Sequence, residues 1–341
     1  MNRAERLAAL TLELVDIPSE SRDEAAVLAR VADIMAAGPA PLVLDTGSAL
    51  LYGPPAPAVV LAGHVDTVPA QGNRPGRLED GVVHGLGSSD MKGGVAVMLA
   101  LAATRPDLGY LYFAREELPV AESALPEVLA TASGVRGAEL VIMLEPTRSA
   151  LEVGCLGNLM AELRFTGTAA HSARPWTGDN ALDRAVTGLR DLVGAVPRSV
   201  RIGEAEYREV LSLTGLRAGV ARNVIPAEAV AEVNFRYAPD RSPAEAEARL
   251  AELTRGEGEL TVLSNAPPAP APVRNPHVER LTAAGAGPVR AKQAWTPVAE
   301  FAAQGIPAVN LGPGDPNLAH KADERVAADA LARCYDILSA L

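Results

Sequence analysis

Hydrophobic and polar positions follow two different periods along the first 145 residues of the chain. Apolar residues spaced three or four apart predict amphipathic helices, and short unbroken apolar runs bounded by Gly or Pro predict buried strands. The helices predicted in this way are 3–16, 22–37 and 91–104. The predicted strands are 57–63, 109–114 and 138–144. Strands that alternate with helices are typical of an α/β fold with a mostly parallel sheet.

The pattern changes after about residue 156. The segments "LMAELRFTG", "VLSLTGLRAG" and "AVAEVNFRYAP" alternate apolar with polar residues, which predicts half-exposed strands. Helices are predicted at 179–196 and 242–253, the second beginning with Ser-Pro. A Pro/Ala-rich stretch at 265–276 and an apolar run at 305–314 then lead the chain back into the first sheet.

We therefore expect two domains. The first is formed by residues 1–156 and 267–341 and has an α/β fold, with a mixed, mostly parallel sheet flanked by helices. The second is a small α+β domain inserted at 157–266. A length of 341 residues is sufficient for two domains, and 48% hydrophobic with 21% charged residues is the composition of a globular protein.

Charge and cysteine content narrow the class of function. The formal net charge of −11 argues against a nucleic-acid partner. The amphipathic N-terminal helix lacks the continuous apolar core of a signal peptide, and no run of uninterrupted apolar residues is long enough to predict a membrane span. The two cysteines, Cys155 and Cys334, are too few for a disulfide framework. We expect a cytoplasmic protein that acts neither on membranes nor on nucleic acid.

Candidate chemistry gathers directly after the predicted strands. In strand order, the residues that follow them are His64 with Asp66, then Glu116 with Glu117, then Glu145, and finally His320. Asp90 immediately precedes the helix predicted at 91–104. Because the carboxyl ends of parallel strands meet at one edge of a sheet, we expect these side chains to converge on one crevice.

Such a cluster of carboxylates is unstable unless its charge is neutralised. Imidazole nitrogens together with Asp and Glu oxygens form a ligand set for zinc, and hydrolases often hold two metal ions roughly 3.5–4 Å apart. Cobalt and manganese accept the same ligands. The sequence therefore predicts a two-metal hydrolytic site.

The adjacent acids Glu116 and Glu117 fit this prediction. Neighbouring side chains at a strand end point in different directions, so one can bind metal while the other acts as a general base toward the attacking water. Asp66 lies two residues after His64, which suits a carboxylate that keeps the ligating imidazole in one tautomer.

The strings that carry this pattern resemble those of the M20 family of metal-dependent aminoacylases and carboxypeptidases. They are "AGHVDTVP", "GLGSSDMKGG", "AREE", "LEP", "AAHSARP", "RNVIP" and "LAHKADE", which together span most of the chain. Within the family, the strings "EPTRSALEVGCLGN" and "GDPNLAHKADE" are most similar to the succinyl-diaminopimelate desuccinylases of the actinobacterial type.

The resemblance implies a role for each residue of the cluster. The implied metal ligands are His64 and Glu145 on one zinc, Glu117 and His320 on the other, and Asp90 bridging both. Glu116 would be the general acid/base, and Asp66 would orient His64. The inserted domain would be a lid and dimerisation domain. From the partner subunit of a homodimer, His171 would help to stabilise the oxyanion; without the resemblance it would be interpreted as a loop histidine.

Substrate contacts are also implied, and one segment departs from the family pattern. Asn223 and Arg236 match positions that contact substrate carboxylates in the family. Desuccinylases usually carry a segment like "W-T-D-V-A-R-F", whereas this chain has "WTPVAEF", with Pro297 and Glu300 in place of the Asp and the Arg. An anion in place of a cation reverses the local preference for an anionic group. Arg174, Arg222 or Arg290 could supply the missing cation.

The leading hypothesis is a dizinc amidohydrolase that cleaves the amide bond of an N-acyl amino acid, with N-succinyl-LL-2,6-diaminopimelate as substrate and succinate and LL-diaminopimelate as products. A deacylase or dipeptidase with a different substrate remains open, because Glu300 could instead meet an ammonium group. A non-catalytic metal-binding paralogue is the third hypothesis. It is disfavoured because Glu116 and all five candidate ligands are present.

Overall fold

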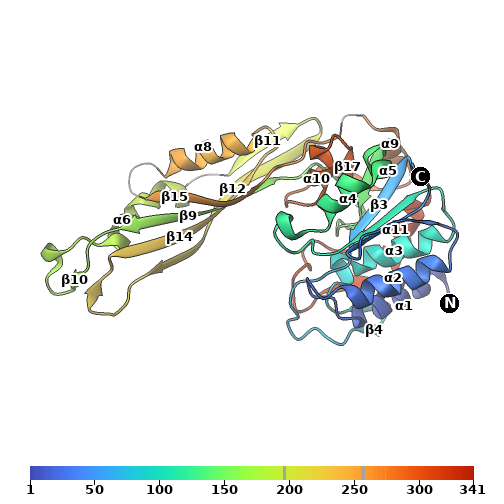
Figure 1. Cartoon of the computed structure of the whole chain (residues 1–341), viewed down its shortest axis with the longest axis horizontal. Helices are drawn as coiled ribbons and strands as arrows, with labels where there is room; N and C mark the ends of the chain where they lie inside the picture. The colour runs from blue at the N-terminus through green and yellow to red at the C-terminus, as the bar shows by residue number, and fades with distance from the viewer. Residues whose placement is uncertain (195–196, 255–257, 273) are drawn as a thin grey trace. The chain divides into compact units, whose positions relative to one another are not determined.

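The computed structural model describes residues 1–194, 197–254, 258–272 and 274–341. These residues form two compact units (Figure 1). The first unit consists of Met1–Val153, Ala271–Arg290 and Pro297–Leu341, and the second consists of Gly154–Pro270 and Ala291–Thr296. The chain therefore passes between the units four times, after residues 153, 270, 290 and 296.

Within the described residues, the first unit is built on a mixed sheet with the strand order β1-β2-β6-β3-β7-β17-β8-β16. In chain order these strands are β1 (Leu42–Asp45), β2 (Ala49–Tyr52), β3 (Val59–His64), β6 (Gly109–Phe113), β7 (Leu140–Met143), β8 (Ala150–Val153), β16 (Gly287–Ala291) and β17 (Ala308–Asn310). The central strands β6, β3, β7 and β17 are mutually parallel, whereas β2 and β8 pair antiparallel with their neighbours. This architecture confirms the predicted α/β fold.

Helices cover both faces of this sheet. They are α1 (Arg3–Asp16), α2 (Ala25–Ala36), α3 (Gly93–Ala102), α4 (Leu125–Thr131), α5 (Ser133–Arg136), α9 (Pro276–Ala283), α10 (Val298–Ala303) and α11 (Ala328–Leu338), with short turns η1 (Ser88–Lys92) and η2 (Val120–Glu122). Figure 1 shows α1, α2, α3 and α11 on one face and α4, α5 and α10 on the other. A small sheet of β4 (Arg77–Glu79), β5 (Val82–His84) and β18 (Arg325–Ala327) lies beside them.

The helix α3 determines where the loop before it lies. Its residues are almost all apolar and buried, as expected for a helix between other helices and the sheet. The helix begins with Gly93 and Gly94, and a Cβ atom on Gly94 would lie 2.7 Å from the carbonyl oxygen of Leu144. The absence of a side chain at Gly94 thus lets the start of α3 approach the end of β7 closely.

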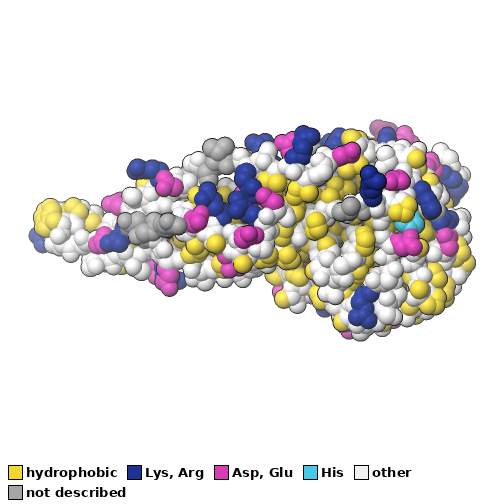
Figure 2. Space-filling model, turned by 90° about the horizontal axis from the view of Figure 1, so that it is seen from above, with side chains coloured by type: hydrophobic (Ala, Val, Ile, Leu, Met, Phe, Trp, Pro, Cys, Tyr) yellow, Lys and Arg dark blue, Asp and Glu magenta, His cyan; other side chains and the backbone are white. Residues whose placement is uncertain are grey.

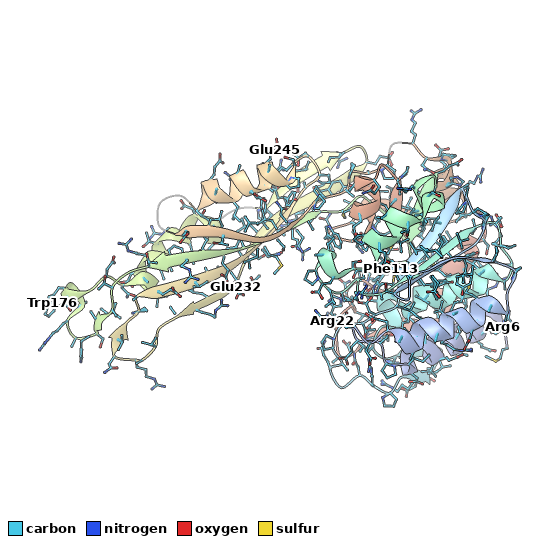
Figure 3. The ribbon with its side chains drawn as sticks, viewed as in Figure 1. Arg6, Arg22, Phe113, Trp176, Glu232 and Glu245 are labelled. Carbon is cyan, nitrogen blue, oxygen red and sulfur yellow. The ribbon has the colours of Figure 1, made fainter. Side chains whose placement is uncertain are left out.

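The second unit contains an antiparallel sheet with the order β11-β12-β14-β9-β15. Its elements are β9 (Gly157–Thr166), β10 (Ala170–His171), η3 (Pro175–Thr177), α6 (Ala181–Gly188), α7 (Arg190–Val193), β11 (Arg198–Ile202), β12 (Ala205–Ala218), β13 (Val224–Ile225), β14 (Glu228–Tyr237), α8 (Pro243–Leu253) and β15 (Glu259–Ala266). Alternate residues of β9, such as Leu163 and Phe165, are buried in a core with α6 and α8, as the predicted alternation requires. Figure 3 shows Glu245 of α8 and Glu232 of β14 on opposite sides of this sheet.

Charged side chains are interspersed on the surface of the second unit around α8 and β11 (Figure 2). Arg198 donates hydrogen bonds to Glu209 and Asp240, and Arg241 donates to Glu209. The carboxylate of Glu209 is 7% exposed and also accepts the N–H of Ala238. These bonds connect β11, β12 and the segment between β14 and α8.

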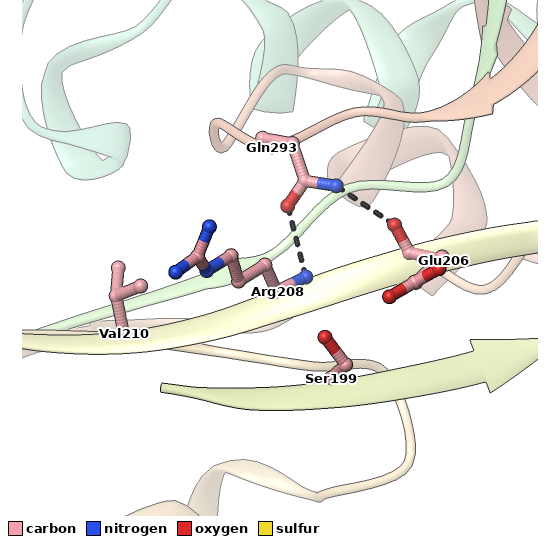
Figure 4. A pocket seen from close by; sticks show the side chains of 5 residues that line it. All are labelled: Ser199, Glu206, Arg208, Val210 and Gln293. Atoms are coloured by element: carbon pink, nitrogen blue, oxygen red, sulfur yellow. Dashed lines mark hydrogen bonds between the residues drawn. The ribbon is translucent and has the colours of Figure 1, made fainter. Parts of the chain in front are cut away.

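The short segment 291–296 is bonded to the rest of the second unit by several residues, among them Gln293 and Trp295, whose Nε1 donates to the carbonyl oxygen of Pro267. Gln293 accepts the N–H of Arg208 at 3.0 Å and donates to the carbonyl oxygen of Glu206 at 2.8 Å (Figure 4). Its amide thereby pairs with β12 as a neighbouring strand would. Together with Ser199, these residues line an open pocket of about 500 Å³.

The elements differ from the sequence prediction in two respects. The helix predicted at 179–196 is two helices, α6 and α7, that meet at Leu189, and residues 195–196 lie outside the described part of the chain. The pattern also does not predict several outer strands, namely β1, β2, β8, β11, β15 and β16. Within the part of the chain that the structure describes, no helix has the length and apolar character needed to cross a bilayer.

Candidate metal centre

The candidate functional side chains lie at the carboxyl ends of the parallel strands. His64 is the last residue of β3, which pairs in parallel with both β6 and β7. Glu116 and Glu117 come shortly after the end of β6, and Glu145 comes shortly after the end of β7. The topology of the sheet therefore brings these four side chains to one edge.

The carboxylate of Asp90 lies between two imidazoles. Its Oδ1 atom is 3.2 Å from Nε2 of His64, and its Oδ2 atom is 3.5 Å from Nε2 of His320. Nε2 of His320 is also 3.0 Å from Oε1 of Glu117, and Nε2 of His64 is 3.9 Å from Oε1 of Glu145. An imidazole at each oxygen of one carboxylate is the arrangement expected when that carboxylate bridges two cations.

These side chains form overlapping groups of metal donors whose ligand atoms lie within 4.8 Å of one another. The groups are His64–Asp90–Glu145, Asp90–Glu117–His320 and His64–Glu116–Glu117. The first two groups share only Asp90, so together they suit two ions better than one. Imidazole nitrogen and carboxylate oxygen are ligands for Zn²⁺, Co²⁺ and Mn²⁺. The residues present therefore fit a divalent metal centre.

The proton affinities at the site reflect a local excess of negative charge. Burial alone would lower the pKa of His64, but hydrogen bonds to Asp66 and Asp90 raise it well above 6.5. The hydrogen bond to Glu117 raises the pKa of His320 to about 9. Divalent cations neutralise the same excess of carboxylate charge, which supports the assignment of a metal centre.

The general-base candidate is itself buried among like charges. Burial raises the pKa of Glu116 well above 4.5, the positive charge of His64 opposes this shift, and the charges of Glu145 and Glu117 reinforce it. A carboxylate whose proton affinity is raised in this way is suited to accept and return a proton during hydrolysis.

Asp66 contacts both parts of the site. Its Oδ1 atom lies 3.5 Å from Nδ1 of His64, and its carbonyl oxygen lies 3.1 Å from the same nitrogen. Its carboxylate also accepts the backbone N–H groups of Glu116 at 3.0 Å and Glu117 at 3.1 Å. Asp66, which is fully buried, therefore holds in place the imidazole of His64 and the backbone at Glu116 and Glu117, called the corner below.

Sequence reasoning missed two residues of this region. The hydroxyl of Ser21 donates to Oδ2 of Asp66 at 2.8 Å, and no pattern near Ser21 indicates this contact. Glu324 accepts backbone N–H groups of the loop that carries Asp90. A signal for Glu324 does exist, because it is the second acid after His320 in the string "LAHKADE".

The remaining candidates from the inserted segment lie in the second unit. His171 belongs to β10 and pairs with Val224 of β13, next to Asn223. The carbonyl oxygen of Asn223 accepts the N–H of Ser172 at 3.0 Å, so His171 and Asn223 lie on adjacent segments. Arg174 is exposed three residues after His171.

Two other substrate-contact candidates are partly buried. Arg236 lies on β14 and donates from Nε to Oδ1 of Asn234 at 2.8 Å, and burial lowers its pKa. Glu300 lies on α10 of the first unit. Its buried Oε1 atom has no hydrogen-bond partner among the described residues.

Comparison with protein families covers most of the chain and all of the metal-centre residues. Residues 60–341 match the model of peptidase family M20/M25/M40. The chain belongs to this family. The fold is also that of an M20 family metallo-carboxypeptidase from Sulfolobus solfataricus, which superposes with a TM-score of 0.77 at 18% identity, covering 100% of this chain and 98% of the other.

Two curated relatives are similar over nearly their whole length. The chain is 42% identical to a Mycobacterium tuberculosis protein provisionally named succinyl-diaminopimelate desuccinylase DapE, over 96% of each chain. It is 36% identical to the succinyl-diaminopimelate desuccinylase of Corynebacterium glutamicum, over 93% of this chain and 90% of the relative. Family membership and these relatives confirm that the chain is a metal-dependent amidohydrolase of the M20 family.

Proposed function

We propose that this M20 enzyme hydrolyses the amide bond of N-succinyl-LL-2,6-diaminopimelate and releases succinate and LL-diaminopimelate. The observation that supports this substrate most strongly is the 42% identity, over 96% of both chains, to a protein named as a desuccinylase. The reaction would serve lysine and diaminopimelate biosynthesis. Two buried free cysteines, Cys155 and Cys334, are compatible with the reducing cytoplasm as its location.

The proposed metal centre uses five ligands. His64 and Glu145 would hold one ion, Glu117 and His320 the other, and Asp90 both, with zinc as the proposed metal. When bound, two such ions polarise an amide carbonyl and lower the pKa of a water molecule. The distances from Asp90 to both imidazoles support this division of ligands.

The proposed proton carrier is Glu116. Its carboxylate would take a proton from the attacking water as the new C–O bond forms, and would return that proton to the amide nitrogen as the C–N bond breaks. Asp66 supports this role because it fixes the backbone N–H of Glu116 and faces Nδ1 of His64. Neutral amine and carboxylic acid are then the balanced products, and they ionise in water.

We further propose that the inserted domain at residues 157–266, which lies within the second unit, acts as a lid and dimerisation domain in a homodimer. His171 would stabilise the oxyanion in the partner's site, and Asn223, Arg174 and Arg236 would contact substrate carboxylates. The pairing of β10 with β13 supports joint action of His171 and Asn223, because it places them on neighbouring segments.

A second candidate function follows from Glu300. Burial raises the pKa of this carboxyl group to about 7, and its Oε1 atom lacks a hydrogen-bond partner among the described residues. A substrate ammonium group would supply the missing donor and favour the charged carboxylate. This observation is compatible with a dipeptide whose free amine binds at Glu300, although N-succinyl-LL-diaminopimelate also carries one free amine and the desuccinylase-named relatives favour the first proposal.

The experiment that separates these functions is a substrate panel on the zinc-loaded wild type and on Glu300→Arg. The panel contains N-succinyl-LL-diaminopimelate, N-acetyl amino acids and dipeptides. Desuccinylation by the wild type with the highest kcat/KM supports the first proposal. Preferential cleavage of dipeptides, reduced in Glu300→Arg, supports the second. Full metal occupancy with no turnover on any substrate would contradict both and favour a non-catalytic paralogue.

A further inference from the structure

One buried acid outside the ligand set receives an unusual number of backbone hydrogen bonds. Glu324 is 2% exposed. Its Oε2 atom accepts the N–H of Gly87, and its Oε1 atom accepts the N–H groups of both Ser89 and Asp90, each at 2.9 Å. Its main-chain carbonyl accepts the N–H of Gly85 at 3.0 Å. Glu324 therefore satisfies four N–H groups in six consecutive residues.

The backbone conformation of residues 85–90 allows their N–H groups to point toward Glu324. Gly87 has φ of 78°, in the left-handed region, and a Cβ atom there would lie 2.7 Å from Cγ2 of Thr67. Glycine is required for both reasons. Successive N–H groups that converge in this way form a concave site for an anion, and here the anion is the side chain of Glu324.

Glu324 connects the two loops that carry the proposed ligands Asp90 and His320. Glu324 follows His320 by four residues, and its carboxylate binds the N–H of Asp90 directly. His320 itself has φ of 61°, and its carbonyl oxygen accepts a hydrogen bond from Nε2 of Gln71 at 2.9 Å. The loop that carries one ligand is thus joined to the loop that carries the other.

We propose that Glu324 is a positioning residue of the metal centre: it sets the distance between the Asp90 carboxylate and the His320 imidazole. This inference rests on the proposed metal centre. Asp90 and His320 come from segments more than 200 residues apart, and no strand pairing joins η1 to the loop at 311–324. A hydrogen bond from the N–H of Asp315 to Oγ of Ser89 joins the two segments, and the carboxylate of Glu324 adds three charge-assisted hydrogen bonds, which are stronger than neutral ones.

The variants Glu324→Gln and Glu324→Ala test the role in steps. An amide keeps one acceptor oxygen for two of the three N–H groups, but its NH₂ group faces the third donor. Alanine leaves all three N–H groups without an acceptor. Loss of an outer contact of this kind lowers metal affinity by about 10- to 100-fold. We expect a loss within this range for Gln and a larger one for Ala.

Metal affinity is measured directly, by titrating the apo-protein with Co²⁺ and recording the visible absorption of the bound ion together with the binding isotherm. A positioning role predicts weaker binding of at least one ion and a changed absorption band in Glu324→Gln, because the Asp90 and His320 ligands are displaced. Wild-type affinity and an unchanged spectrum in both variants would overturn the inference. If the wild type binds no Co²⁺, the proposed metal centre itself is wrong.

Glu209→Gln is the matched control. Glu209 is likewise buried and accepts several hydrogen bonds, one of them from the N–H of Ala238, but it lies in the second unit. Its replacement should leave Co²⁺ affinity and spectrum unchanged, whatever it does to stability. An equal loss of affinity in Glu209→Gln would show a general effect of removing buried charge and would overturn the specific role of Glu324.

A measurement on the wild type decides the question even if the Glu324 variants do not fold. Backbone hydrogen exchange of the apo-protein should show protected N–H groups at Gly87, Ser89 and Asp90. Rapid exchange at these three positions in the folded protein would show that Glu324 does not restrain the loop, and the inference would fail.

Discussion

At the scale of single residues, the corner at Glu116 and Glu117 depends on an acid from a different strand. Asp66 accepts both backbone N–H groups of the corner, so the main chain of the two glutamates is restrained while their side chains remain available to the site. Glu117 contacts His320, whereas Glu116 lies in a donor group with His64. In the proposed centre the adjacent like charges are tolerated, because Glu117 would bind a cation and Glu116 would carry a proton.

Replacement of Glu116 by Gln separates metal binding from proton transfer. The amide keeps the size of the side chain but cannot accept a proton from water. We expect turnover of the hydrolysed substrate to fall by about 10²- to 10⁴-fold while metal content is unchanged. Steady-state kinetics and elemental analysis of the same preparation measure both quantities. Retained turnover would falsify the role given to Glu116.

Glu300 predicts a pH-dependent stability. Burial raises its folded-state pKa to about 7 from an ordinary value of 4.5, so the folded protein binds this proton more tightly than the unfolded chain does. The free energy of unfolding therefore falls as pH rises from about 4.5 to about 7. Glu300→Gln should be more stable than the wild type by on the order of 1–2 kcal/mol at pH 8 and equal to it at pH 4.

Urea unfolding of both proteins at the two pH values, in the same metal concentration, checks this prediction. An advantage of Glu300→Gln that is the same at pH 4 and pH 8 would contradict it, because the effect would then arise from packing and not from ionisation.

The sequence predicts the residues of the site that follow strands, and it misses those that depend on loops meeting in space. His64 and Glu145 come directly after apolar runs, so their convergence follows from the parallel sheet. Ser21 and Glu324 act on Asp66 and on the Asp90 loop through contacts between distant segments. Neither contact leaves a periodic trace in the sequence.

At the scale of secondary-structure elements, α1 is joined to the metal-binding region by one buried lysine. Lys92 is 1% exposed, and its Nζ atom donates to the carbonyl oxygens of Leu14 at 2.9 Å and Ile17 at 2.8 Å. These carbonyls lie at the C-terminal end of α1, where the last carbonyl groups of a helix lack intrahelical N–H partners. The lysine thus attaches the end of α1 to the start of α3.

Lys92→Met is expected to lower the free energy of unfolding by about 1–3 kcal/mol, because the partly buried carbonyl oxygen of Ile17 loses the donor from Lys92 and that of Leu14 keeps only the N–H of Ile17. Arg6→Met, at an exposed position of the same helix, is the control and should change stability by no more than about 0.5 kcal/mol. Chemical denaturation of the three proteins measures the difference. Equal stability of the Lys92 variant and the wild type would contradict the proposed attachment.

Element prediction succeeds where the hydrophobic signal is long or unbroken and fails at the edges of sheets. The central strands β3, β6 and β7 lie within two residues of the predicted runs. The outer strands β1 and β2 span four residues each, and four residues are too few to show a period. The break between α6 and α7 at Leu189 directly follows Gly188, but the apolar periodicity continues across it and predicts a single helix.

At the scale of the whole molecule, the two units should respond differently to metal removal. All proposed ligands lie in the first unit, and its carboxylates repel one another when no cation is bound. An ion at 1,000 times its dissociation constant stabilises the folded state by about 4 kcal/mol, which raises Tm by roughly 10 °C for a domain of this size.

Calorimetry of metal-loaded and chelator-treated protein measures this effect. We expect the transition that contains the first unit to move to lower temperature on chelation, and the intrinsic fluorescence of Trp176 and Trp295, both in the second unit, to report a smaller change. Identical melting curves before and after chelation would contradict the assignment of the metal centre.

The return of residues 291–296 to the second unit has a practical consequence for anyone who wishes to prepare the metal-binding half alone. Excision of the contiguous insertion 154–270 would leave Gln293 without partners, because its side-chain amide forms hydrogen bonds with Arg208 and Glu206. A minimal metal-binding protein therefore needs two new joins, 153 to 271 and 290 to 297, and the gene must be edited at both places.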